Sequence, residues 1–273
     1  LSTIAWSFAT AERRDPTVFN TLAEEIKANA VKMKTQEISN TLWAFAKSRS
    51  VDIDLFDALG HTAVTEPMIW MFKSQELSNT VWAFATVGVQ HPVLFTKIEA
   101  AVIQKRYDMV PQNIANILWS YAKLQVIPHS NMFPVLLEVA AGKLVQYKRQ
   151  ELSTVIWATA QVCPDQAEFF GVATRLCCQR LKEFSPNAVA NLTRDLSNVA
   201  TTAPGAFRQI LFEGVRRLSQ FDPGALCILL QGALAATSNP AISAEAPELW
   251  EHVSAICSHL LPRIHRLRTA ELQ

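Results

Sequence analysis

The sequence predicts an all-α fold, an α-solenoid of about seven two-helix repeats of 37–39 residues. One observation is a phrase, Leu-Ser-Asn-Thr-Val-Trp-Ala-Phe-Ala at residues 77–85, which has close copies on both sides. A second is the even spacing of its tryptophan, because successive copies lie 37, 39, 37 and 38 residues apart. The marker tryptophans are Trp6, Trp43, Trp82, Trp119 and Trp157.

Each repeat contains a second segment, marked by a phenylalanine about 13 residues after the tryptophan position. These phenylalanines are Phe19, Phe56, Phe95, Phe133, Phe170 and Phe207. Apolar residues in both segments follow a period near 3.6, which predicts two helices per repeat and no strand. One second helix should run from about Pro92 to Arg106. Pro16, Pro204 and Pro247 should open others, because a proline at the first helical position loses no hydrogen bond.

We expect one solenoid over residues 1–273, with well-matched repeats in 1–200 and degenerate repeats in 201–273. The register continues past residue 157, but Arg194 and Gln231 stand where the tryptophan would be. The chain begins and ends within repeat-like sequence, so we expect it to be a fragment of a longer array.

Composition favours a well-packed protein, since 49% of residues are hydrophobic and only 8 are glycine. The longest apolar stretch, near residues 226–236, is too short to cross a bilayer, so we expect no membrane insertion. The sequence holds no glycine-rich phosphate loop, nucleophile elbow or paired carboxylates. We therefore expect a protein that is not an enzyme, with no cofactor and no small-molecule substrate.

The cysteines and histidines near the C-terminal end predict no metal site. All five cysteines lie from Cys163 onward, in a pattern that suits reduced core residues better than disulfides. His252, Cys257, His259 and His265 cluster, but only His252 and His259 share a helical face. Because no further ligand completes a tetrahedron, we expect no zinc there.

The first helices present columns of polar residues at equivalent positions. Residues four and seven positions apart lie on one stripe, which would line the inside of the solenoid if first helices form its concave wall. An asparagine amide can donate and accept at once, which suits the edge of an RNA base. The candidate RNA-binding stripe comprises Asn40, Lys47, Asn79, Thr86, Asn116, Lys123, Thr154, Gln161, Asn191 and Asn198. Equally, these amides could bond the backbone of the neighbouring repeat and hold the stack together.

A second series of equivalent positions, the basic ladder, holds lysines and arginines at spacings of 38, 37 and 37 residues. Its members are Lys105, Lys143, Arg180 and Arg217. Such an edge could follow an RNA backbone with about one cation per nucleotide. The alternative is structural, because cations at helix C-termini offset the helix dipole. With 25 basic against 24 acidic residues, any RNA affinity must come from local segregation of charge.

The tryptophans also have two interpretations. Aromatic residues at helical spacing are usually part of a core, so we expect them to wedge between successive repeats. Stacking on RNA bases is the other possibility.

The phrase at residues 77–85, with its copies at 37–47 and 113–124, resembles the octotricopeptide repeat. It is also similar in style to the helical arrays that precede RAP domains. The resemblance covers residues 1 to about 200 and implies helical pairs of 38 residues. It further implies a mitochondrial or chloroplast protein that binds RNA, with any targeting segment outside this chain.

The leading hypothesis is thus a helical-repeat RNA-binding protein of organelle gene expression. It would stabilise, process or help translate transcripts, or belong to an organellar ribosome, and its partner would be single-stranded or ribosomal RNA. The alternative is a non-enzymatic scaffold subunit that holds protein partners within a large organellar complex.

Overall fold

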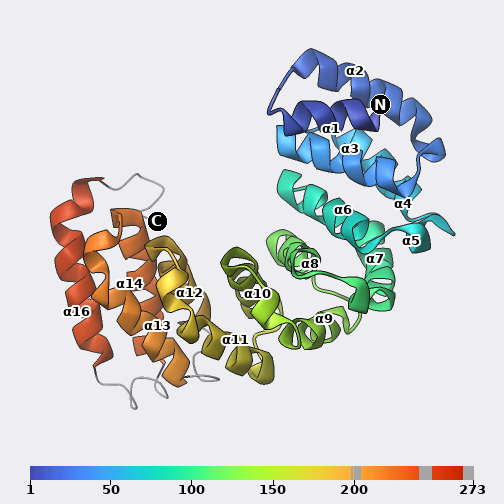
Figure 1. The fold of residues 1–273 in the computed structure, drawn as a ribbon. Helices are drawn as coiled ribbons and strands as arrows, with labels where there is room; N and C mark the ends of the chain where they lie inside the picture. The colour runs from blue at the N-terminus through green and yellow to red at the C-terminus, as the bar shows by residue number, and fades with distance from the viewer. Residues whose placement is uncertain (198, 200–203, 240–247, 267–273) are drawn as a thin grey trace. The chain divides into compact units, whose positions relative to one another are not determined.

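The computed structural model describes residues 1–197, 199, 204–239 and 248–266, and these residues form helices and turns without any strand (Figure 1). The described helices pair as predicted, which confirms the all-α solenoid. They gather into two compact units, Leu1–Gly142 with four helix pairs and Lys143–Gln273 with three. A single continuous array over both units stays a prediction. Among the described helices, none combines the length and hydropathy needed to span a bilayer.

In the first unit the first helices pack side by side in one layer and the second helices in another (Figure 1). The first helices are α1 (Ser2–Thr10), α3 (Thr35–Ser48), α6 (Ser74–Val87) and α8 (Pro111–Leu124). The second helices are α2 (Pro16–Asn29), α4 (Ile53–Ala63), α7 (Pro92–Gln104) and α9 (Met132–Ala141). Shorter segments are η1 (Ala30–Lys32), α5 (Met68–Met71) and η2 (Arg106–Asp108).

The second unit repeats this arrangement, with first helices in contact with one another and second helices behind them. Its first helices are α10 (Arg149–Val162), α12 (Pro186–Ser197) and α14 (Pro223–Thr237). Its second helices are α11 (Ala167–Gln179), α13 (Pro204–Arg216) and α16 (Leu249–Leu260). The 3₁₀ corners after second helices are η3 (Leu144–Gln146), η4 (Leu181–Glu183), η5 (Leu218–Gln220) and η6 (Leu261–Arg266).

Local sequence signals set where helices begin. Among the first helices, α6 shows how the start is fixed. The Glu76 carboxylate accepts a hydrogen bond from the backbone N–H of Lys73 at 2.9 Å and so satisfies a donor at the N-terminal end of α6. Glu37 and Glu151 do the same for α3 and α10. The predicted proline starts are confirmed at Pro16, Pro92 and Pro204, whereas Pro247 lies outside the described residues.

The first helices of the first unit end in a common way. The residue six positions after the tryptophan adopts a left-handed conformation, with φ of 54° at Glu12, 56° at Arg49, 76° at Gly88 and 55° at Gln125. The next N–H then bonds back into the last turn, as between Val89 and the carbonyl of Phe84 at 3.1 Å. Only one of the four positions is glycine, so the neighbouring packing must hold the other three in this conformation.

Successive repeats share their core through aromatic contacts. In the first unit, the phenylalanines of α2, α4 and α7 pack edge-on against the aromatic ring of the following first helix. The ring centroids are 5.0 Å apart for Phe19–Phe45, 5.1 Å for Phe56–Phe84 and 4.9 Å for Phe95–Tyr121. All six of these rings are buried. The Tyr121 hydroxyl also donates to the carbonyl of Phe95 at 2.6 Å, so the buried phenol is satisfied across the repeat boundary.

The tryptophans are less buried than the sequence pattern predicts. Trp43, Trp82, Trp119 and Trp157 are only half-buried, and Trp6 is exposed. The fully buried ring lies two positions later, as at Phe84. Two residues correspond to roughly 200° around a helix, so the two rings face different directions. The tryptophans therefore lie at the border of the first-helix layer, with part of each indole open to solvent.

Candidate nucleic-acid interface

The predicted stripe lies on the exposed side of the first helices. Lys47, Thr86, Lys123 and Gln161 are exposed. Asn40, Asn79, Asn116, Thr154 and Asn191 are half-buried, and Asn198 lies outside the described residues. In each unit these side chains lie on packed neighbouring helices, so they form a regular series there.

The asparagine amides of the stripe do not hold the repeats together. The side chains of Asn40, Asn79 and Asn116 form no hydrogen bond within the described part of the chain. The amide of Asn191 donates only to its own helix, to the carbonyl of Asn187 at 2.9 Å. Three amides thus keep donors and acceptors for a ligand.

The amide that links repeats is at a different position. Asn113 donates from Nδ2 to Oγ of Ser78 at 3.1 Å, and both side chains are buried between α8 and α6. The sequence also allowed the asparagines of the stripe to hold neighbouring repeats together. Asn113, three residues before Asn116, makes such a contact instead. The periodicity alone could not separate the two positions, since both fall on the same side of the helix.

Two members of the basic ladder are engaged within the protein. Nη1 of Arg180 donates to the carbonyl of Tyr147 at 3.0 Å, and Nη1 of Arg217 donates to the carbonyl of Phe184, also at 3.0 Å. Each bond reaches back 33 residues, to the segment just before the preceding first helix. Arg180 also pairs with Glu183, where its side-chain hydrogen bond lowers the carboxyl pKa. These contacts favour a structural role for both arginines.

The two lysines of the ladder, Lys105 and Lys143, are half-buried. Lys105 follows α7 and lines a groove together with Asn79, so one stripe residue and one ladder residue meet there. This groove has a volume of about 490 Å³ between α6 and α8. Its other lining side chains include Lys73, Gln75, Asp108 and Gln112, which makes it rich in amides and charge.

A second groove, of about 400 Å³ between α10 and α12, lies at the same register position in the other unit. Five of its lining positions lie 75 residues, or two repeats, after those of the first groove. The pairs are Ser74/Arg149, Gln75/Gln150, Val110/Ser185, Gln112/Asn187 and Asn113/Ala188. The stripe residue Asn191 opens into this second groove. Because the grooves recur with the repeat, they are a property of how first helices pack, with residue identity varied from repeat to repeat.

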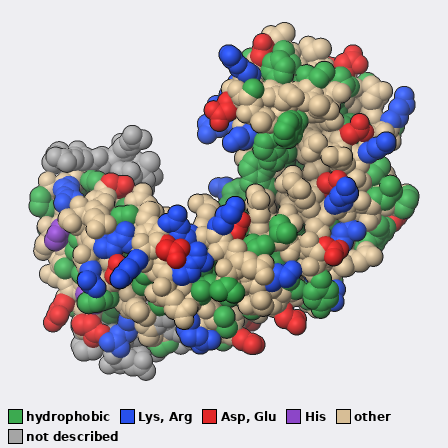
Figure 2. All heavy atoms as spheres, viewed as in Figure 1, with side chains coloured by type: hydrophobic (Ala, Val, Ile, Leu, Met, Phe, Trp, Pro, Cys, Tyr) green, Lys and Arg blue, Asp and Glu red, His purple; other side chains and the backbone are tan. Residues whose placement is uncertain are grey.

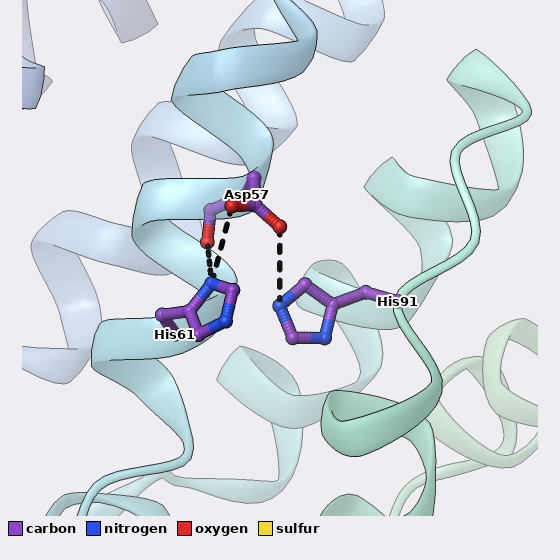
Figure 3. Close-up of side chains that lie close together, drawn as sticks. All are labelled: Asp57, His61 and His91. Carbon is purple, nitrogen blue, oxygen red and sulfur yellow. Dashed lines mark hydrogen bonds and ion pairs between the residues drawn. The ribbon is translucent and has the colours of Figure 1, made fainter.

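The sequence analysis missed a cluster of Asp57, His61 and His91, whose possible ligand atoms lie within 4.8 Å of one another (Figure 3). Asp57 and His61 lie one turn apart on α4, and His91 precedes α7. Nε2 of His91 is 3.8 Å from Oδ1 of Asp57, and Nδ1 of His61 is 3.3 Å from Oδ2. A signal in the sequence is Gly60, because a larger residue there would collide with His91: a Cβ would lie 2.5 Å from its Cδ2.

This cluster does not fit a metal ion, although its side chains are of metal-binding types. Nδ1 of His91 accepts the N–H of Leu94 at 3.1 Å and caps α7, so the neutral ring carries its proton on Nε2. A metal at Nε2 would move that proton to Nδ1, against the Leu94 N–H. His91 is 5% exposed, and its Nε2 forms no hydrogen bond. Burial, followed by the charge of His61, lowers the pKa of His91 and favours the neutral capping form.

Packed helix pairs with recurrent grooves define a helical-repeat protein whose first-helix face offers amides and cations to a ligand. Over residues 1–214 the sequence matches the family model described as RNA-editing substrate-binding complex 6 protein, and the chain belongs to this family. The match supports the coarser part of the resemblance, a helical family related to RNA processing. The specific octotricopeptide type stays a prediction. A comparison with curated proteins gives no match.

Replacing Arg217 with Gln tests its structural role. Loss of the bond to the Phe184 carbonyl should lower the free energy of unfolding by about 1–2 kcal/mol, measured by urea denaturation. Lys182→Gln, at an exposed position on η4, is the matched control and should change stability by less than about 0.5 kcal/mol. Equal stability of the Arg217 variant and the wild type would contradict the assignment.

The His91 cap predicts a dependence of stability on pH. Because the folded protein holds the pKa of His91 below the ordinary value of 6.5, the unfolded chain binds more protons as pH falls. The contribution of His91 should be complete above pH 6.5 and decline below it. In His91→Asn an amide can still cap α7 but does not titrate. Melting curves at several pH values should show a weaker decline for this variant, and parallel declines would refute the prediction.

Proposed function

We propose that this protein is an RNA-binding subunit of an RNA-editing complex and holds single-stranded RNA along its first-helix face. The observation that carries the proposal is the recurrent groove between packed first helices, where polar side chains lie beside cations. In the first groove the free amide of Asn79 lies beside Lys105, and in the second groove Asn191 lies beside Arg149. Amides can read base edges, and Lys105 can contact a phosphate. Membership of the RNA-editing substrate-binding complex 6 family supports the same partner.

Within this proposal the stripe reads bases and the basic edge grips the backbone, each repeat addressing about one nucleotide. Lys105 is the stronger candidate for a phosphate contact, since Arg180 and Arg217 already donate to backbone carbonyls. The protein acts without catalysis of its own and without a cofactor. We place it in an organelle, mitochondrion or chloroplast, on the basis of the repeat resemblance and the family.

The second candidate function is a scaffold that binds other proteins of the same complex. It is favoured by the two engaged arginines, which weaken a continuous basic rail, and by the net charge of +1. Under this alternative the grooves would receive protein side chains, and the chain would bind RNA only through its partners.

RNA binding and its salt dependence separate the two functions. Fluorescence polarisation with an unstructured RNA of about 16 nucleotides should show direct binding by the purified chain. If about three phosphates are contacted, affinity should fall about 18-fold between about 50 and 200 mM salt. Absence of binding at the lower salt concentration would contradict the proposal and favour the scaffold.

The stripe is tested in the same assay with the double variant Asn79→Ala, Asn116→Ala. Loss of two hydrogen bonds to RNA should weaken binding about tenfold with little change in melting temperature, because neither amide is bonded within the protein. Asn29→Ala, on the second-helix layer, is the control and should bind like the wild type. Unchanged affinity in the double variant would remove these amides from the interface.

A further inference from the structure

The largest hollow among those described lies at the other end of the first helices from the groove between α6 and α8. It has a volume of about 630 Å³ and is formed by the C-terminal ends of α1, α3 and α6. Its apolar lining comes from Ala9, Ala46, Val51 and Val87 together with the half-buried indole of Trp82. A volume of this size suits a small organic ligand.

The rim of this hollow is basic. Arg14, Lys47 and Arg49 line it against one acidic residue, Glu12, and all four side chains are exposed. Figure 2 shows basic side chains close to hydrophobic surface over the ends of α1 and α3. Within the described residues, none of the three cations forms an ion pair or a side-chain hydrogen bond. Three unpaired cations repel one another, so an anion bound among them would gain affinity from all three.

Lys47 and Arg49, which lie beside Trp82, are four and six residues after Trp43, the tryptophan of the preceding repeat. The same two positions can be compared for the other tryptophans. Comparison of equivalent repeat positions shows that, among Trp43, Trp82 and Trp119, only Trp82 has cations of the preceding repeat at these positions. For Trp82 these positions hold two cations, Lys47 and Arg49. For Trp43 they hold Thr10 and Glu12, and for Trp119 they hold Thr86 and Gly88.

The indole of Trp82 is available to a ligand. It is half-buried, which fixes its orientation, and its N–H forms no hydrogen bond within the described part of the chain. A fixed, partly exposed aromatic face beside cations matches the way single-stranded nucleic acids are held, with the base stacked and the phosphate paired. An acidic peptide would use the cations but would leave the aromatic face without a planar partner.

We propose that this hollow is a nucleotide subsite, in which a base of single-stranded RNA stacks on Trp82 while Arg14, Lys47 and Arg49 contact its phosphates. The inference rests on the proposed function, since it assigns a further anchoring point to the same RNA. The subsite lies at the opposite end of the first helices from the Asn79–Lys105 groove. A bound strand would therefore be held at both ends of the first-helix layer.

Trp82→Leu tests the stacking contact in the polarisation assay with unstructured RNA. Loss of one stacked base should weaken binding by about 5-fold to 150-fold. Trp119→Leu is the matched control, because Trp119 is also half-buried but the preceding repeat places Thr86 and Gly88 beside it where Trp82 has Lys47 and Arg49, and it should bind within about twofold of the wild type. Melting curves of both variants would show whether each remains folded. Equal losses in both variants, or no loss in Trp82→Leu, would overturn the subsite.

A second variant, Lys47→Gln with Arg49→Gln, tests the phosphate contact without touching buried residues. The slope of log affinity against log salt should become shallower by about 1.4, the value expected for two lost phosphate contacts on a single strand. An unchanged slope would overturn the subsite even if Trp82→Leu fails to fold.

Competition with AMP and UMP distinguishes a nucleotide within RNA from a free nucleotide. If AMP and UMP displace the labelled RNA only at millimolar concentrations, the result supports a subsite for a nucleotide within RNA. If they displace it at concentrations as low as those at which unlabelled RNA competes, the result would overturn that assignment. If wild-type protein binds no RNA, the proposed function fails. If wild type binds RNA and the Asn79/Asn116 variant binds weakly while both subsite variants bind normally, only this inference fails.

Discussion

The edge-on contact between a second-helix phenylalanine and the aromatic ring of the next first helix governs the first unit of this structure. Phe56 has no comparable partner within its own helix pair, so its burial requires Phe84 from the following repeat. A large aromatic side chain buries about 150–250 Å², which makes this shared contact a major part of each repeat's stability. Repeats must therefore stack in order, and stacking brings the first helices side by side in a layer.

That layer determines where a ligand can bind. Its inner positions are occupied by Phe45, Phe84 and Tyr121, so polar residues are displaced toward the open side and toward the helix ends. The grooves between α6 and α8 and between α10 and α12 share register positions two repeats apart, because each lies where two first helices pack together. In such a protein the side chains at the recurring positions determine what is bound.

The sequence predicted the helix pairs and their spacing, because these depend on local periodicity and on proline and acidic signals at helix starts. It could not tell which of two aromatic residues is deeper, since Trp82 and Phe84 both fit the apolar pattern. The role of Arg217 was ambiguous because its acceptor, the Phe184 carbonyl, lies 33 residues away. The cluster of Asp57, His61 and His91 was missed for the same reason: packing of α4 against the start of α7 brings it together. RNA contact by the stripe stays a prediction, although the free amides of Asn40, Asn79 and Asn116 leave it open.

The central claim, that RNA lies on the first-helix face, is tested most directly by ultraviolet crosslinking of bound RNA followed by peptide mass spectrometry. The account predicts crosslinks in peptides from α3, α6 and α8, centred on residues near Asn79 and Trp82. Crosslinks confined to the second helices α2, α4 and α7 would contradict it.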